Sequence, residues 1–150
     1  MLSGNSILIT GGTGSFGRKF AATVLERFPT IRRLVIYSRD ELKQFEMSQL
    51  FPSSRYPTVR FFLGDVRDKD AMGRAMDGVE IVSHQAAYQD YMPDFSTFIS
   101  TNATSTALIM ELIVEKKLDV RKVVVASSQA AYGEGNYTCV EHGAFEAKGR

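Results

Sequence analysis

The sequence predicts an α/β fold in which a doubly wound parallel sheet is covered by helices on both faces. Short runs of β-branched and apolar residues alternate with amphipathic stretches along most of the chain, and this alternation is typical of βαβ units. Most of the apolar runs are nearly continuous, as expected for parallel strands that are buried on both faces. The sequence shows no repeat and no low-complexity segment, so we expect one domain.

Five strands are expected, at residues 7–10, 34–37, 59–63, 80–83 and 122–126. The runs Ile7-Leu8-Ile9 and Val123-Val124-Val125 are examples of the continuous apolar character. Because consecutive parallel strands are joined by right-handed crossovers, the simplest strand order in this sheet is 3-2-1-4-5.

Four helices are expected between these strands. The first carries apolar residues at helical spacing from Phe16 to Phe28 and ends before Pro29. The second begins at an Asp40 cap and runs to Leu50, and the third covers residues 69–76. The fourth and longest follows residues 93–94 and should place one mostly apolar face against the sheet, formed by Phe95, Phe98, Ile99, Asn102, Leu108, Ile109, Leu112 and Ile113.

Composition restricts the class of protein and its surroundings. The 150 residues include 18 Lys and Arg, 17 Asp and Glu, one Cys and no Trp, which fits one globular domain in a reducing compartment. The net charge is +1 and the sequence has no block of charges of one sign, so we expect no nucleic-acid partner. No apolar run reaches the roughly 18 residues of a membrane span, and the N-terminus does not resemble a signal peptide. We therefore expect a cytoplasmic protein without a membrane partner.

The strongest functional signal is a glycine-rich segment between the first strand and the first helix. It reads TGGTGSFG over residues 10–17, with glycines at positions 11, 14 and 17. The first glycine permits a tight turn, the second lets backbone N–H groups approach a pyrophosphate, and the third allows close packing of helix on strand. The start of the helix also favours an anion. We therefore expect a dinucleotide to contact Gly11, Thr13, Gly14, Ser15, Phe16 and Gly17.

The end of the second strand predicts which dinucleotide binds, because a residue there contacts the adenosine ribose in folds of this kind. Here the segment reads Tyr37-Ser38-Arg39-Asp40. The Arg39 guanidinium suits a 2′-phosphate through charge-assisted hydrogen bonds worth about 1.5–3 kcal/mol, which favours NADP over NAD, with Ser38 and Lys43 as further contacts. In the alternative, Arg39 is a solvated loop cation and Asp40 is the acidic residue that binds the ribose of NAD.

Two more segments follow strands at the same edge of the predicted sheet. Asp65 and Val66 come after the third strand, where the adenine ring would lie. The Asp65 carboxylate could accept the adenine amino group while Val66 offers its backbone N–H, or Asp65 is an ordinary turn residue. Gln85, Ala86 and Ala87 follow the fourth strand, and their small size suits either close approach to the middle of the cofactor or simple packing.

The segments ILITGGTGSFG (7–17), YSRDELKQ (37–44) and GDVRD (64–68) resemble the extended short-chain dehydrogenase/reductase family that modifies nucleotide sugars. From Ser6 to about Asp70 the chain is most similar to the inverting UDP-N-acetylglucosamine 4,6-dehydratases. The resemblance implies a Rossmann fold, NADP as the cofactor and a nucleotide sugar as the substrate.

The second half of the chain instead resembles the nucleotide-sugar 4-epimerases. Where the dehydratases show Ser-Thr-Asp-Lys after the fifth strand, this chain reads Ala126-Ser127-Ser128-Gln129-Ala130. The resemblance places Ser128 at the catalytic hydroxyl position. Gln129 and Ala130 stand where the dehydratases have an acid that helps to expel water. The resemblance therefore implies 4-epimerisation through a 4-keto intermediate in surface polysaccharide biosynthesis, with the inverting 4,6-dehydratase reaction as the alternative.

The family's catalytic tyrosine and lysine are absent from this sequence. In these enzymes a tyrosine takes the proton of the sugar's C4 hydroxyl, and a lysine four residues later lowers the pKa of that tyrosine. Here Tyr132 is followed by Asn136, and Tyr137 by Glu141. Because a missing general base costs about 10²- to 10⁴-fold, we expect residues 1–150 to be inactive alone. A non-catalytic NADP-binding module is the further alternative.

The C-terminal part of the sequence predicts a truncated NAD(P)-binding Rossmann domain over residues 1–150. A sixth strand and a substrate domain are missing, and we expect neither a strand nor a helix over residues 144–150. Cys139 and His142 have the spacing of metal ligands, but two ligands do not complete a zinc site, so we expect an exposed loop and no metal.

The resemblance gives roles to two features of the middle of the chain. It implies that Asn102 holds the active-site geometry beside the cofactor, as one of the cofactor-binding residues, although a hydrogen bond between helices would also explain this residue. It also implies a homodimer formed through the fourth helix. His84, at the end of the fourth strand, is expected to be structural or to lie at the edge of the cofactor.

Overall fold

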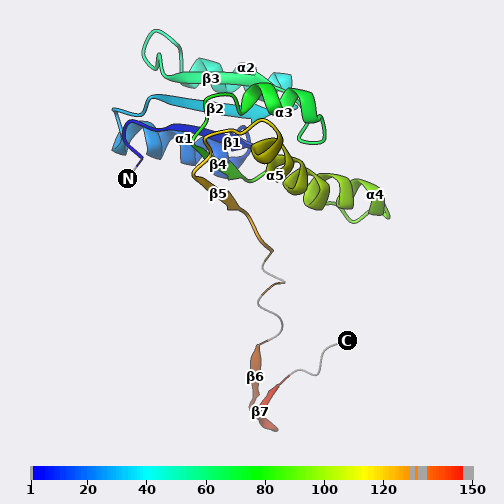
Figure 1. Ribbon diagram of the computed structural model, residues 1–150. Helices are drawn as coiled ribbons and strands as arrows, with labels where there is room; N and C mark the ends of the chain where they lie inside the picture. Colours follow the sequence, from blue (N-terminus) through cyan, green and yellow to red (C-terminus); the bar gives the residue numbers. More distant parts are fainter. Residues whose placement is uncertain (1, 129–130, 132–134, 147–150) are drawn as a thin grey trace.

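The computed structural model describes residues 2–128, 131 and 135–146 of the chain. It confirms the predicted parallel sheet of five strands in the order β3-β2-β1-β4-β5 (Figure 1). The strands are β1 (Ser6–Thr10), β2 (Arg33–Ser38), β3 (Val59–Leu63), β4 (Ile81–His84) and β5 (Lys122–Val125). Each begins and ends within one residue of its predicted position.

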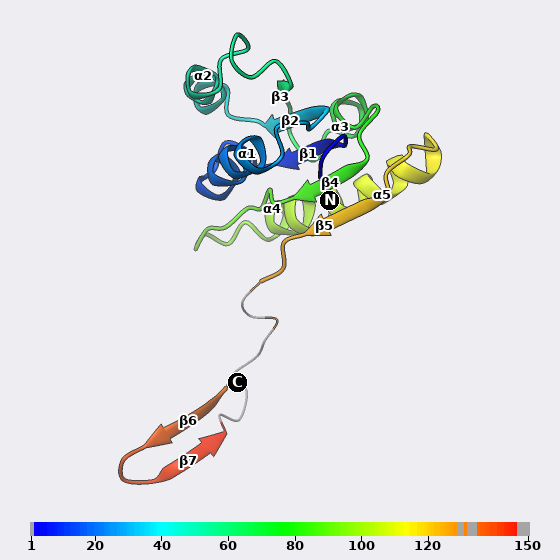
Figure 2. The same cartoon turned by 90° about the vertical axis from the view of Figure 1, so that its left-hand side faces the viewer.

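Successive residues of the central strands enter two cores on opposite faces of the sheet. Ile7 and Ile9 of β1 pack with α1 (Ser15–Arg27) and α2 (Glu41–Leu50). Leu8 packs on the other face with α3 (Lys69–Ala75) and α5 (Ser105–Glu115). Figure 2 shows α1 and α2 on one side of the strands and α3 on the other. The sheet is therefore covered on both faces, as the continuous apolar runs predicted.

The large apolar side chains of α2 do not form its buried face. Gln44 and Met47 are buried instead. The Gln44 amide donates hydrogen bonds to the carbonyl oxygens of Ser38 and Phe62, at 2.9 and 2.8 Å, so it links the ends of β2 and β3. Three large apolar side chains of α2 remain exposed: Leu42, Phe45 and Leu50.

The longest predicted helix is a run of three segments, α4 (Phe95–Phe98), the π-helix η1 (Ile99–Thr104) and α5. The prediction that one apolar face covers the sheet is wrong for the first half, because Phe95 and Ile99 are exposed whereas Ile109 and Leu112 are buried. A π-turn holds more residues than an α-turn, so apolar positions before and after it no longer share one face. By length and composition alone, the run Phe95–Glu115 could cross a membrane, because its mean hydropathy over 18 residues reaches 1.2.

The prediction of no strand over residues 144–150 is wrong for residues 144–146, and residues 147–150 lie outside the described part of the chain. β6 (Asn136–Cys139) and β7 (Gly143–Glu146) form an antiparallel hairpin separate from the main sheet (Figure 1). Tyr137 and Phe145 face each other across it, with ring centroids 5.7 Å apart. Gly143, with a φ of +74°, permits the turn before β7. Each strand has only four residues, too few for a clear alternating pattern in the sequence.

Candidate cofactor-binding site

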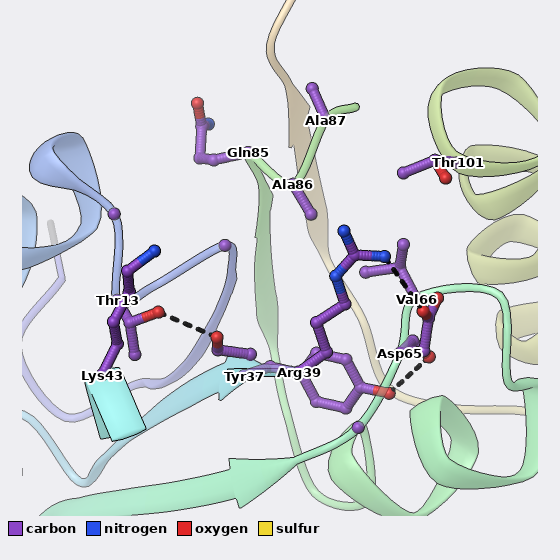
Figure 3. A pocket seen from close by; sticks show the side chains of 14 residues that line it. Thr13, Tyr37, Arg39, Lys43, Asp65, Val66, Gln85, Ala86, Ala87 and Thr101 are labelled. Carbon is purple, nitrogen blue, oxygen red and sulfur yellow. Dashed lines mark hydrogen bonds and ion pairs between the residues drawn. The ribbon is translucent and has the colours of Figure 1, made fainter. Parts of the chain in front are cut away.

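A cavity of about 310 Å³ opens at the carboxyl ends of β1, β2, β3 and β4, where doubly wound sheets bind their ligands (Figure 3). Its walls are the glycine loop after β1, the end of β2, the turn after β3, the segment after β4 and one residue of η1. Most of the residues predicted to bind the cofactor line it: Gly11, Thr13, Gly14, Ser38, Arg39, Lys43, Asp65, Val66, Gln85, Ala86 and Ala87.

Some predicted residues lie elsewhere, and some lining residues were missed. The cavity wall does not include Ser15, Phe16, Gly17, Asn102 or Ser128. It does include Tyr37, Gly64 and Thr101, for which the sequence analysis proposed no role. Tyr37 and Gly64 adjoin predicted residues, so their position next to strand ends was the available signal. Thr101 comes from η1, and no sequence pattern indicated a π-turn there.

The glycine loop needs its glycines for two close approaches. Gly11 has a φ of +64°, and a Cβ at this residue would lie 3.0 Å from the backbone nitrogen of Ala86. A Cβ at Gly17 would lie 2.2 Å from the carbonyl oxygen of Gly12, so only glycine lets α1 pack on the loop. Gly14 is the N-cap of α1, and no side chain caps this end of the helix. The loop therefore presents backbone N–H groups at a helix start, as an anion site requires.

The loop is tied to the end of β2 through side chains. The hydroxyl groups of Thr13 and Ser38 form a buried hydrogen bond of 2.8 Å. Arg18 donates to the carbonyl oxygen of Thr13 at 3.1 Å and pairs with Glu46 of α2 at 2.8 Å. These contacts fix the loop relative to β2 and α2 before any ligand is bound.

Arg39 and Asp65, both predicted to contact the cofactor, contact each other. The Arg39 guanidinium lies 3.5 Å from the Asp65 carboxylate (Figure 3). Arg67 binds the same carboxylate with two side-chain nitrogens, at 2.9 and 2.7 Å, and with its backbone N–H at 2.9 Å. The side-chain hydrogen bond from Arg67 holds the pKa of Asp65 down at about 2. A carboxylate offers about four acceptor positions, so these contacts occupy Asp65 within the protein.

Asp40 and Lys43 lie at the start of α2. Asp40 is the predicted cap, because its carboxylate accepts the backbone N–H of Lys43 at 2.9 Å. This hydrogen bond lowers the pKa of Asp40, and the Lys43 ammonium lies 3.2 Å from the same carboxylate. Lys43 lines the cavity whereas Asp40 does not. Two cationic side chains, those of Arg39 and Lys43, therefore line the cavity beyond the end of β2.

Tyr37 and Gly64 form the floor beneath this end. The Tyr37 hydroxyl donates to the carbonyl oxygen of Asp65 at 2.8 Å, and the side chain is fully buried. Burial raises the pKa of Tyr37, so the phenol stays protonated. A Cβ at Gly64 would lie 2.3 Å from the Tyr37 oxygen. Glycine at position 64 is thus needed for the tyrosine to reach across from β2 to the turn after β3.

The other predicted residues have contacts away from the cavity. Asn102 accepts the backbone N–H of Tyr88 at 2.7 Å and donates to its carbonyl oxygen at 2.9 Å, which anchors the segment after β4 to η1. Ser128 is exposed just after β5, and Gln129, Ala130 and Tyr132 lie outside the described residues. Their predicted roles stay predictions.

Cys139 and His142 belong to the hairpin, with the sulfur 3.2 Å from Nδ1. Among the residues that the structure describes, no group of three or more acidic, histidine or cysteine side chains could hold a metal.

The sheet order, the glycine loop at a helix start and the cavity at the strand ends define the class: this is a Rossmann-like domain. Comparison with protein families agrees. The polysaccharide biosynthesis protein family matches residues 7–140, and the chain belongs to this family.

Two curated relatives are named for reactions of nucleotide sugars. The chain is 40% identical over 136 residues to an inverting UDP-N-acetylglucosamine 4,6-dehydratase of Campylobacter jejuni strain 81-176, and 34% identical over 137 residues to a UDP-glucose 4-epimerase of Rickettsia canadensis. Each match covers 87% of this chain and 38% of the relative. The chain thus spans well under half the length of the curated relatives it matches.

A solved structure with the same fold contains a dinucleotide. It is the DesIV double mutant, a dTDP-glucose 4,6-dehydratase from Streptomyces venezuelae with NAD and DAU bound. Its TM-score is 0.69 at 26% identity, and the match covers 85% of this chain and 41% of that one.

Proposed function

We propose that this chain is the NADP-binding part of an enzyme that modifies a nucleotide sugar at C4 through a 4-keto intermediate, in surface polysaccharide biosynthesis. The observation that carries the proposal is the cavity itself, in which an uncapped helix start and two cationic side chains lie at the ends of parallel strands. When bound, the dinucleotide would supply reversible hydride transfer. The chain's own residues would bind and orient it.

The glycine loop fits a pyrophosphate and the ribose end fits an extra phosphate. Backbone N–H groups at the start of α1 suit the pyrophosphate charge. Arg39 and Lys43 both line the ribose end, and each has a side chain more than half exposed. An incoming 2′-phosphate would take Arg39 from Asp65, which Arg67 continues to neutralise. The two exposed cations support NADP over NAD, although DesIV holds NAD.

Calorimetric titration of the chain with NADP and with NAD tests this preference. Arg39→Ala should weaken NADP binding about 10- to 150-fold, the equivalent of 1.5–3 kcal/mol, and leave NAD binding nearly unchanged. Arg27→Ala is the matched control, because it removes an exposed arginine from the far end of α1. Equal affinities for the two dinucleotides, or an Arg39→Ala variant that binds NADP normally, would reject the assignment.

We propose 4-epimerisation as the reaction, with Ser128 binding the reacting sugar oxygen. Support comes from the sequence around Ser128, where Gln129 and Ala130 replace the acid of a dehydratase with an amide and a methyl group. The higher identity to the inverting dehydratase favours the 4,6-dehydratase alternative. Incubating the protein, extended to include any encoded Tyr-x-x-x-Lys segment, with UDP-N-acetylglucosamine distinguishes the two. A C4 epimer supports our proposal, and a 4-keto-6-deoxy sugar supports the alternative.

A non-catalytic NADP-binding module is the second candidate function. It is favoured by one observation, the absence of a Tyr-x-x-x-Lys pair from the sequence. Reading the coding DNA beyond codon 150 tests it: a continuing frame with that pair supports the enzyme, and a stop codon supports the module.

We further propose that the protein is cytoplasmic and forms a homodimer through the run Phe95–Glu115. Sedimentation at rising protein concentration would test the homodimer.

A further inference from the structure

His84 ends β4 beneath the cavity and is buried, with only 3% of its surface exposed. Both ring nitrogens have hydrogen-bond partners. Nδ1 lies 2.8 Å from the Thr10 hydroxyl oxygen of β1, and Nε2 lies 2.9 Å from the Ser105 hydroxyl oxygen at the start of α5. The imidazole therefore bridges a central strand of the sheet and the helical run that carries Thr101.

The partners of these two hydroxyl groups determine where the ring proton lies. The Thr10 oxygen also accepts the backbone N–H groups of Gln85 and Ala86, both at 3.0 Å. These two donors fill its lone pairs, so the Thr10 proton must point to Nδ1, which is then unprotonated. The Ser105 hydroxyl donates to the carbonyl oxygen of Thr101, a group that can only accept. Its oxygen must then accept a hydrogen bond from Nε2–H.

A second proton on the ring would break this arrangement. Protonated Nδ1 would be a third donor facing the two lone pairs of Thr10, so the N–H of Gln85 or Ala86 would lose its partner. The groups that face His84 offer no compensating charge: Thr10 from β1, Val125 from β5, and Ser105 and Thr101 from the helical run are all neutral. Burial also lowers the pKa of His84.

Both ends of this network reach the wall of the cavity. Gln85, Ala86 and Thr101 all line it, and Figure 3 shows Ala86 and Thr101 on neighbouring walls. The backbone of Ala86 lies close to the glycine loop, because a Cβ added to Gly11 would lie only 3.0 Å from it. A shift of Ala86 would therefore change the gap beside the glycine loop.

We propose that His84 is a positioning residue for the dinucleotide: its neutral Nε2–H tautomer holds Gln85 and Ala86 against Thr10 and fixes Thr101 across the cavity. This inference rests on the proposed cofactor binding. It gives His84 no role in proton transfer to the substrate, because both nitrogens are occupied within the protein.

Nitrogen-15 spectroscopy of the imidazole tests the tautomer without any ligand. The chain has two histidines, so a His142→Gln variant leaves His84 as the only signal source. We expect a bare Nδ1 and a protonated Nε2 at pH 8, and a ring that takes up its second proton below the ordinary histidine pKa of 6.5. A proton found on Nδ1 at pH 8, or a ring that titrates at or above pH 6.5, would overturn the proposal.

Dinucleotide affinity tests the positioning role. His84→Leu should weaken binding of the preferred dinucleotide at least tenfold. His84→Asn, whose side-chain oxygen can accept the Thr10 proton, should recover part of the loss. Val82→Ala is the matched control, because Val82 is a buried residue of the same strand that packs in the adjoining core. It should lower the unfolding temperature without weakening binding.

The outcomes separate this inference from the proposed function. If the wild-type chain binds neither NADP nor NAD, the proposed function fails. If the wild-type chain binds and His84→Leu binds equally well, the role of His84 alone fails. Equal losses in His84→Leu and Val82→Ala would also overturn it, because they would show a general effect of destabilisation. If His84→Leu does not fold, the dinucleotide affinity of His84→Asn and the nitrogen-15 spectrum still test the role of His84.

Discussion

Removing the charge of Asp65 should destabilise the fold by an amount that can be worked out from its contacts. Hydrogen bonds from Arg67 and the charge of Arg39 bring the pKa of Asp65 from an ordinary 3.8 to about 2. Since each pKa unit corresponds to about 1.4 kcal/mol, ionised Asp65 stabilises the folded chain by at most about 2 kcal/mol at neutral pH. Asp65→Asn should therefore lower the free energy of unfolding by up to this amount.

The pH dependence identifies the cause. A depressed pKa gives stability that is complete well above pH 3.8 and is lost as the pH falls through 2, so the difference between wild type and Asp65→Asn should shrink to roughly half near pH 3. Urea unfolding at pH 7, 5 and 3 measures it, with Asp119→Asn as the control at an exposed loop aspartate. A difference that stays constant with pH would refute the electrostatic reasoning, and so would a variant as stable as the wild type.

Three further changes test other parts of the site. Gly17→Ala should abolish dinucleotide binding in calorimetry, since its Cβ would meet the Gly12 carbonyl oxygen at 2.2 Å, whereas Gly135→Ala, with open space around it, should bind normally. Tyr37→Phe should lower the free energy of unfolding, measured in urea, by about 1–3 kcal/mol, because the Asp65 carbonyl loses its buried donor. Burial lowers the pKa of His84, so on acidification the unfolded chain takes up a proton at this residue before the folded chain does. The free energy of unfolding should therefore fall below pH 6.5, by at most about 1.4 kcal/mol per pH unit. In His84→Asn the decrease in the free energy of unfolding at acid pH should be smaller.

The parts of the site that depend on local sequence were predictable. Gly11 and Gly17 follow a strand and open a helix, and both requirements are local, so their spacing was enough to place them. The strand ends were also predictable, and with them the positions of Arg39 and Asp65 beside the cavity. The carboxyl ends of parallel strands lie at one edge of the sheet, independent of the residues elsewhere in the chain.

The features that depend on side chains meeting across the fold were not predictable. Arg39 and Asp65 follow different strands, and nothing in either segment shows that they pair. Gln44 is buried because its amide donates to the carbonyl oxygens of Ser38 and Phe62, which a pattern of apolar residues cannot show. Thr101 reaches the cavity from a π-turn, and helical periodicity assumes that no such turn occurs.

The hydrogen bond between Thr13 and Ser38 has a consequence for selectivity. Because the Thr13 hydroxyl is paired with Ser38 of β2, the glycine loop would meet a bound diphosphate mainly with main-chain amides, which respond to negative charge and not to chemical identity. Adenosine diphosphate, NAD and NADP carry the same diphosphate and should all satisfy it. Discrimination among them must come from the rest of the cleft, where side chains such as those of Arg39 and Gln85 line the wall.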